Sequence, residues 1–288
     1  MPVANVILQW LVLGMSPLTL EQLAIVVTFD PLSGDFDSSL GLAHPDDVIQ
    51  LCSSLVIRAA DDTVQLAHAS VKEYFLQKPR ATTLWDIESG HAAIAHCCLE
   101  YLLHVGWQKH VKYTKFPLFK YSAKFWLDHY KHSNKSSNLQ EIVTVFFQAK
   151  GSALKTWIKE YYGVLNNYYG NVPLNHAAML GLEEIIKRLM VTSEWLGTHG
   201  TSIEAAAKGG HISTVRVLLD GGANVNAKGG EYCNALYATS YIGYTEIARL
   251  LLVKGADVNA QGGKYGNASQ AAISEGLLRS PSVALVLH

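Results

Sequence analysis

The sequence has few of the patterns that carry catalysis or a covalent framework. Its four cysteines, Cys52, Cys97, Cys98 and Cys233, have no C-x-x-C spacing. That excludes the usual zinc and disulfide frameworks and favours reduced, intracellular thiols. The motifs of zinc peptidases (H-E-x-x-H), serine hydrolases (G-x-S-x-G) and phosphate-binding loops (G-x-x-x-x-G-K-[ST]) are also missing. We therefore expect no catalytic residue, no cofactor and no metal, and hence a protein that is not an enzyme.

Twelve histidines still require a search for metal ligands. His129 and His132 lie three residues apart, a spacing that lets two imidazoles on one helix share a metal ion. His91 and His96 are five residues apart and do not share a helix face. We prefer the simpler interpretation for His129 and His132, which is an exposed polar face of a helix.

Long apolar runs are absent as well. The longest near the N-terminus, from Val3 to Met15, is interrupted by Asn5 and Gln9 and has no basic residue before it. It is shorter than the roughly 20 residues that a membrane-spanning helix needs. We expect a buried helix here, no signal peptide, no membrane span and a cytoplasmic protein.

Charge is distributed unevenly along the chain. Residues 1–80 hold four basic and nine acidic residues, whereas residues 81–170 hold ten lysines, no arginine and six acidic residues. The acidic first segment would repel nucleic acid, because binding to a phosphate backbone depends on Lys and Arg. The stretch "KHVKYTKFPLFKYSAKFW" is compatible with RNA or anionic lipid, but lysines lying along a helical linker explain it more simply. We expect neither a nucleic-acid nor a membrane partner.

A repeat with a period of 33 residues dominates the C-terminal part. The tripeptide Val-Asn-Ala occurs at Val225–Ala227 and again at Val258–Ala260, and the same step joins Gly210, Gly243 and Gly276. Each unit predicts a helix of small residues, an amphipathic helix and a Gly-rich turn. That order is typical of stacked helical repeats.

The stretches "GGHISTVRVLLDGGANVNA" and "IGYTEIARLLLVKGADVNA" resemble the second helix and loop of ankyrin repeats. About four units fit within residues 171–288. The first, "PLNHAAMLGLEEIIKRLM", is shortened, and the last is incomplete and meets Pro281.

Ankyrin stacks bind proteins on a concave face made of hairpin tips and first helices. The resemblance therefore implies a protein partner. The candidate contact residues on that face are Lys228, Glu231, Tyr232, Tyr237, Tyr241, Lys264 and Tyr265. The tyrosines either anchor a partner or only cover neighbouring turns.

Residues 1–80 predict three helices followed by a β-hairpin, which is the order of a winged helix. Thr19 and Gln22 form a capping box that begins a helix at Leu20. "LVIRA" and "TVQLA" alternate as hairpin strands on either side of two aspartates. Because the expected recognition helix and wing carry Asp46, Asp47, Asp61 and Asp62 with Arg58 nearly alone, we do not expect this winged helix to read DNA.

The run from "LQWLVLGMSPLTLEQLAIVV" to "VQLAHASVKEYF" resembles the winged helix that follows the NTPase domain of fungal NACHT proteins, which are NLR-like STAND proteins. "HAAIAHCCLEYLL" and "YSAKFWLDHY" resemble the helical segment that joins such domains to ankyrin repeats. The resemblance gives His68, which opens the helix in H-x-S-x-x-E-Y, a nucleotide-sensing role when a NACHT domain is present. Without a phosphate-binding loop His68 cannot bind a nucleotide alone. In the isolated chain we expect a packed or hydrogen-bonded histidine, with Ser70 as helix cap and Tyr74 in the core.

These observations predict a mainly α protein with a small β-hairpin. Its expected parts are a winged-helix domain (1–80), a helical linker (81–170) and ankyrin repeats (171–288). We favour a non-enzymatic interaction or regulatory protein in an NLR-like signalling or self/non-self recognition system. The alternative is the regulatory C-terminal part of a nucleotide-dependent STAND switch whose NACHT domain is missing or separate.

Overall fold

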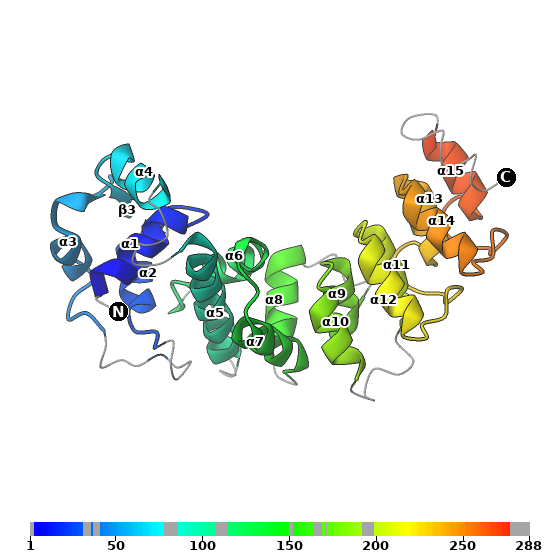
Figure 1. The fold of residues 1–288 in the computed structure, drawn as a ribbon, viewed down its shortest axis with the longest axis horizontal. Coiled ribbons are helices and arrows are strands. Elements are labelled where there is room, and N and C mark those ends of the chain that lie inside the picture. The colour runs from blue at the N-terminus through cyan, green and yellow to red at the C-terminus, as the bar shows by residue number, and fades with distance from the viewer. Residues whose placement is uncertain are drawn as a thin grey trace. The chain divides into compact units, whose positions relative to one another are not determined.

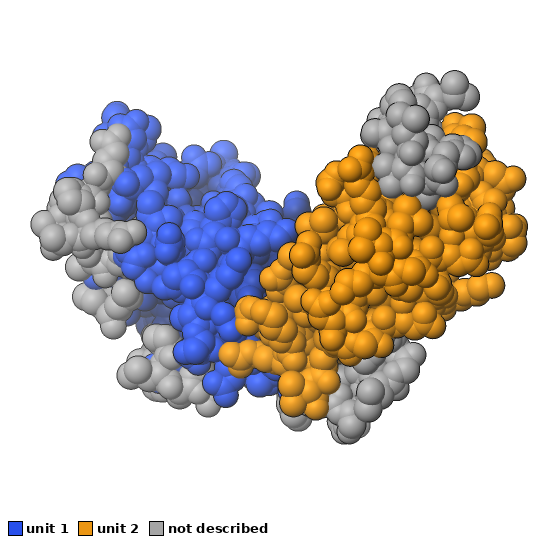
Figure 2. Space-filling model, turned by 45° about the vertical axis from the view of Figure 1, so that its right-hand side comes forward, with its two compact units in different colours: residues 1–161 blue, residues 162–288 orange. Residues whose placement is uncertain are grey.

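The computed structural model describes most of the chain. The described residues are 3–30, 36, 41–77, 86–106, 115–149, 152–163, 169–170, 172–191 and 199–276. The chain divides into two compact units, residues 1–161 and residues 162–288, which Figure 2 shows in different colours. The division into three domains that the sequence suggests stays a prediction.

The first unit begins with the predicted winged helix (Figure 1). Its elements are α1 (Val3–Leu13), β1 (Leu18–Thr19), α2 (Leu20–Val26), α3 (Asp47–Cys52), β2 (Val56–Arg58), β3 (Thr63–Leu66) and α4 (Ala69–Gln77). The strands form a sheet in the order β1-β3-β2, and both pairings are antiparallel. The three helices and the hairpin confirm the prediction. β1 was not predicted, because two residues are too few to show an alternating pattern.

The start of α2 shows how local sequence sets this fold. The Thr19 side chain accepts a hydrogen bond from Gln22 N at 3.3 Å, and Gln22 Oε1 accepts one from Thr19 N at 3.0 Å. This reciprocal pair is the predicted capping box, and the helix begins at Leu20 as expected.

Four further helices follow in the chain: α5 (Ile87–Gly106), α6 (Phe119–His132), α7 (Ser137–Gln148) and α8 (Ser152–Tyr162). Trp126, Phe146, Phe147 and Trp157, all fully buried, form an aromatic cluster with ring centroids 5.7–6.4 Å apart. The Trp157 indole N–H donates to Ala123 O at 2.9 Å, so this ring is fixed in orientation as well as buried.

The second unit contains helix pairs in the predicted repeat order. The pairs are α9 (Pro173–Met179) with α10 (Glu183–Met190), α11 (His199–Lys208) with α12 (Ile212–Asp220), and α13 (Ala235–Ile242) with α14 (Thr245–Val253). Gly181, Gly210 and Gly243 end the first helices with φ of 71°, 76° and 97°, a conformation that glycine adopts without strain. One more helix, α15 (Ala268–Gly276), lies where a fourth repeat is predicted, and Pro281 lies outside the described residues.

Candidate functional site

His68 lies between β3 and α4 and is exposed. Its Nδ1 accepts a hydrogen bond from Ser70 N at 3.2 Å and lies 2.8 Å from Ser70 Oγ. His68 itself therefore caps α4, and the prediction that Ser70 is the cap is wrong. An accepting Nδ1 places the proton of the neutral ring on Nε2, where it remains available to donate.

Tyr74 also differs from the prediction. Its side chain is 54% exposed, although the sequence places it in the core. α4 has no fully buried apolar face among its described side chains: Val71 and Phe75 are half-buried and the others are exposed.

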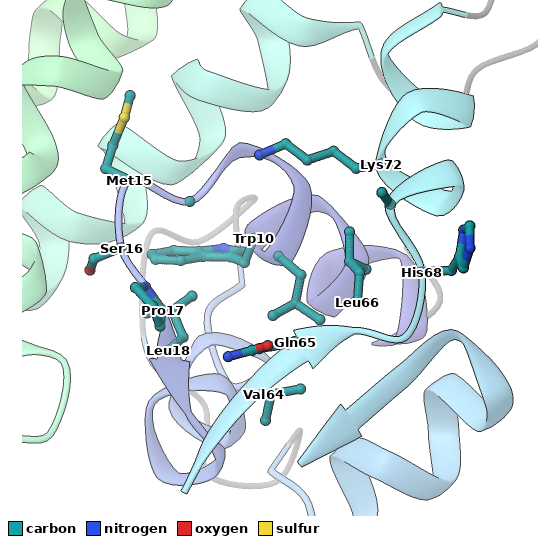
Figure 3. A pocket seen from close by; sticks show the side chains of 13 residues that line it. Trp10, Met15, Ser16, Pro17, Leu18, Val64, Gln65, Leu66, His68 and Lys72 are labelled. Carbon is teal, nitrogen blue, oxygen red and sulfur yellow. The ribbon is translucent and has the colours of Figure 1, made fainter. Parts of the chain in front are cut away.

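A groove of about 390 Å³ opens next to His68. Its walls come from the segment between α1 and β1, from β3 and from the first turn of α4 (Figure 3). Trp10 lies at the base, Lys72 extends across toward the end of α1, and the His68 ring points away from Trp10. His68 is therefore at the rim of this groove.

Two buried histidines in the α5–α6 packing were not recognised from sequence. His91 Nδ1 lies 2.8 Å from His129 Nδ1, and His129 Nε2 lies 2.9 Å from the hydroxyl of Tyr121. Tyr121 in turn accepts a hydrogen bond from Met15 N at 3.2 Å. The predicted exposure of His129 is wrong, since its side chain is completely buried.

The chain of hydrogen bonds has a preferred direction. If Tyr121 donates to His129 Nε2, His129 Nδ1–H donates to His91 Nδ1 and every linking atom has a partner. In the reverse direction the Tyr121 hydroxyl would receive two donors and have no acceptor among the described residues. Both imidazoles are neutral, because burial lowers the pKa of His91 to about 4 and of His129 to about 3. In the described residues no group of three or more His, Cys, Asp or Glu side chains is placed to hold a metal ion.

The candidate contact residues of the ankyrin unit come together as a row of tyrosines. The Tyr241 ring lies 5.1 Å from that of Tyr232 and 6.1 Å from that of Tyr265. Tyr237 lies beneath them with its ring parallel to Tyr241 within 8°, and its hydroxyl accepts a hydrogen bond from Tyr265 N at 3.0 Å. Because Tyr237 is only 2% exposed, it supports this row and is not a contact residue itself, which corrects the prediction.

Charged side chains flank the row. Lys228 and Lys264 are exposed, and the Lys264 ammonium lies 5.1 Å from the centre of the Tyr265 ring. Glu231 forms an ion pair with Lys208, whose ammonium also lies over the Tyr232 ring. We call Tyr232, Tyr241 and Tyr265, together with Lys228 and Lys264, the tyrosine surface. It combines half-buried aromatic rings with exposed basic side chains.

Glu204 was missed by sequence reasoning. It is fully buried, and its carboxylate accepts a hydrogen bond from Tyr232 N at 2.9 Å. Burial raises its pKa, and the Tyr169 hydroxyl, the hydrogen bond from Tyr232 N and the charge of Lys208 oppose that rise. The signal for this residue was weak, because a single glutamate in an alanine-rich helix is usually exposed.

Comparison with known proteins agrees with this architecture. Residues 2–88 match the family of GPI inositol-deacylase winged helix domains, and residues 174–262 match the family of ankyrin repeats in three copies. The chain combines a winged-helix domain with ankyrin repeats. The mainly helical fold class predicted from the sequence is thereby confirmed.

A curated relative extends the likeness beyond these two segments. It is the azaphilone pigments biosynthesis cluster protein L of Monascus ruber, which is 31% identical over 261 residues. The alignment covers 76% of this chain and 55% of the relative, so the chain spans about half the length of the protein it matches. In the described part of the chain, no helix is long and apolar enough to cross a membrane.

Proposed function

We propose that this chain is a non-enzymatic, cytoplasmic regulatory protein that recognises a protein partner through the tyrosine surface of its ankyrin repeats. Ankyrin repeats are protein-interaction modules, and that general role follows from the family match. The single observation that supports this location is the row of three half-buried tyrosines beside two exposed lysines. Tyrosines whose rings already pack against one another lose little conformational freedom on binding and serve well as anchors.

The wider setting we propose is an NLR-like signalling or self/non-self recognition system. The pairing of this type of winged helix with ankyrin repeats supports that setting, because it is the arrangement of fungal NACHT proteins. The matched relative is fungal as well.

Affinity purification with quantitative mass spectrometry tests the proposal. The wild-type chain is compared with a Tyr232→Ala variant and with a Lys228→Glu/Lys264→Glu variant, whose substitutions lie at exposed positions. An Arg216→Ala/Arg249→Ala variant, altered on the exposed side of α12 and α14, is the control. Partners that the control retains and both surface variants lose support the proposal, and partners retained by all three variants contradict it.

A second candidate function is that of the regulatory part of a nucleotide-dependent switch. His68 favours it, because the ring is exposed and offers an Nε2–H donor beside the groove. In this case a NACHT domain supplied by a longer gene product or a separate chain would hold the nucleotide. Calorimetry of the chain with ATP and with GTP, alone and together with such a domain, is the test. Nucleotide affinity that does not change with His68→Ala in the assembled state would contradict the role of His68.

A further inference from the structure

We propose that the groove beside Trp10 binds a short, extended, acidic segment of a partner protein, which adds as a strand to the free edge of β3 at Leu66. This site belongs to the winged-helix domain and is separate from the ankyrin surface. It does not depend on the function proposed above.

The hydrogen bonds between β2 and β3 show which way the backbone groups of β3 point. Ala59 N donates to Thr63 O at 2.8 Å, and Ala67 N donates to Leu55 O at 2.9 Å. The backbone groups of Thr63 and Ala67 therefore face β2. Because successive residues of a strand point their backbone groups to alternate sides, those of Leu66 face the opposite side, where β1 lies.

β1 covers only the beginning of that opposite edge. Leu18 pairs with Val64, and the same register would place Ser16 opposite Leu66. In the described part of the chain no backbone hydrogen bond joins Ser16 and Leu66. The N–H and C=O of Leu66 are thus left facing the groove, which both residues line.

The segment before β1 is held away from β3 by α6. The backbone N–H of Met15 donates to the Tyr121 hydroxyl, and the Trp10 ring packs against the Tyr121 ring with centroids 5.4 Å apart. Since Tyr121 is fixed in turn by His129, the separation of the two segments is built into the packing of α6. The groove is therefore already formed before any partner binds.

The charges around the groove select an acidic strand. Lys72 is the one lysine or arginine among its lining residues, and no carboxylate lines it. The first turn of α4, with Ala69 in the lining, adds the positive end of a helix. This contrasts with residues 1–80 as a whole, where acidic residues outnumber basic ones nine to four.

The size of the groove sets the length of the segment. A volume of about 390 Å³ is at the low end of ligand pockets and holds a few residues. The short free edge also limits strand addition to the neighbourhood of Leu66. Main-chain hydrogen bonds would hold such a segment, and the Lys72 ammonium would form ion pairs with its carboxylates.

The test uses the isotopically labelled full chain and two alternating peptides, acetyl-Glu-Val-Glu-Val-Glu-amide and acetyl-Lys-Val-Lys-Val-Lys-amide. We expect the acidic peptide to shift the amide NMR signals of Leu66 and Lys72 and to slow exchange of the Leu66 amide. The basic peptide should do neither. Lys72→Glu should weaken binding of the acidic peptide by roughly threefold to tenfold. Lys155→Glu, at an exposed lysine of α8, is the matched control and should leave binding unchanged.

Three outcomes would overturn the proposal. The two peptides could shift the same signals equally, which would remove the electrostatic selection. The acidic peptide could leave Leu66 unaffected, which would remove strand addition. ATP or ADP could shift the signals of this groove while the acidic peptide does not, which would make it a nucleotide site.

Discussion

Glu204 on α11 holds the backbone of Tyr232 in the next hairpin tip: its Oε1 accepts a hydrogen bond from Tyr232 N at 2.9 Å. Lys208, one turn later on the same helix, pairs with Glu231 and lies over the Tyr232 ring. Each of these contacts joins one repeat to the following one. The position of the tyrosine surface therefore depends on the stacking of repeats as well as on its own turn.

Two substitutions of Glu204 should distinguish the contribution of its hydrogen bond to stability from the contribution of its charge. Glu204→Ala leaves Tyr232 N without its acceptor and should cost about 1–3 kcal/mol of unfolding free energy. Glu204→Gln keeps an acceptor oxygen and removes a buried charge, so we expect stability at pH 7 equal to or above that of the wild type. Urea unfolding of the two variants checks this, and a Gln variant as unstable as the Ala variant would show that the charge itself is required.

Alanine substitution at two glycines, one in a loop and one in a hairpin tip, distinguishes the cost of backbone strain from the cost of steric overlap. Gly222 and Gly263 both have positive φ, 90° and 72°, but a Cβ at Gly222 meets nothing within 4 Å whereas one at Gly263 would overlap the Tyr237 ring. Gly222→Ala should therefore cost only the conformational penalty, about 1–2 kcal/mol. Gly263→Ala should cost more and should also displace Tyr237, visible as a change in tyrosine near-ultraviolet circular dichroism. Equal losses of stability in the two variants would mean that the hairpin tip shifts to accommodate the Cβ at Gly263.

Acid should destabilise the α5–α6 pair through its buried histidines. An unfolded histidine takes up its proton near pH 6.5, whereas His91 and His129 resist protonation until about pH 4 and pH 3. As pH falls from 6.5 toward 4, the unfolded state binds protons that the folded state does not. Stability should fall by up to about 1.4 kcal/mol per pH unit for each histidine. Unfolding of the first unit, followed by tryptophan fluorescence from pH 8 to pH 4.5, measures this slope.

The control for this experiment is a His91→Asn/His129→Gln variant, whose amides retain hydrogen bonding but do not titrate. Its stability should vary less with pH over the same range. An unchanged slope would assign the effect to other groups.

Removing the Tyr121 hydroxyl should loosen the segment that borders the groove. Tyr121→Phe keeps the ring packing with Trp10 but leaves Met15 N and His129 Nε2 without their shared partner. We expect a loss of about 1–3 kcal/mol and faster hydrogen exchange at Met15. Tyr130→Phe, at another buried tyrosine of α6, is the comparison, and equal exchange at Met15 in both variants would contradict the link.

Patterns that depend on local chemistry could be predicted from the sequence. The Thr19–Gln22 capping box predicted the start of α2, because it involves residues only three positions apart. The 33-residue repeat predicted the order of the helix pairs, because its residues recur at regular spacing. The tyrosine row could be anticipated for the same reason, since Tyr232 and Tyr265 occupy equivalent positions one period apart.

Features that depend on distant contacts could not be predicted. The burial of Tyr237 arises from stacking between repeats, and the burial of His129 arises from packing against α5, where its hydrogen-bond partner His91 is 38 positions away. The groove at Leu66 depends on the hydrogen bond from Met15 N to the Tyr121 hydroxyl, which joins residues 106 positions apart. No periodicity in one helix carries that information.

The measurement that tests the central claim most directly is the affinity of a partner identified by purification for the chain and its Tyr232→Ala and Arg216→Ala variants. We predict that Tyr232→Ala weakens binding about fivefold or more while Arg216→Ala leaves it unchanged, provided that both variants melt within a few degrees of the wild type. Equal affinities for all three chains would contradict recognition through the tyrosine surface.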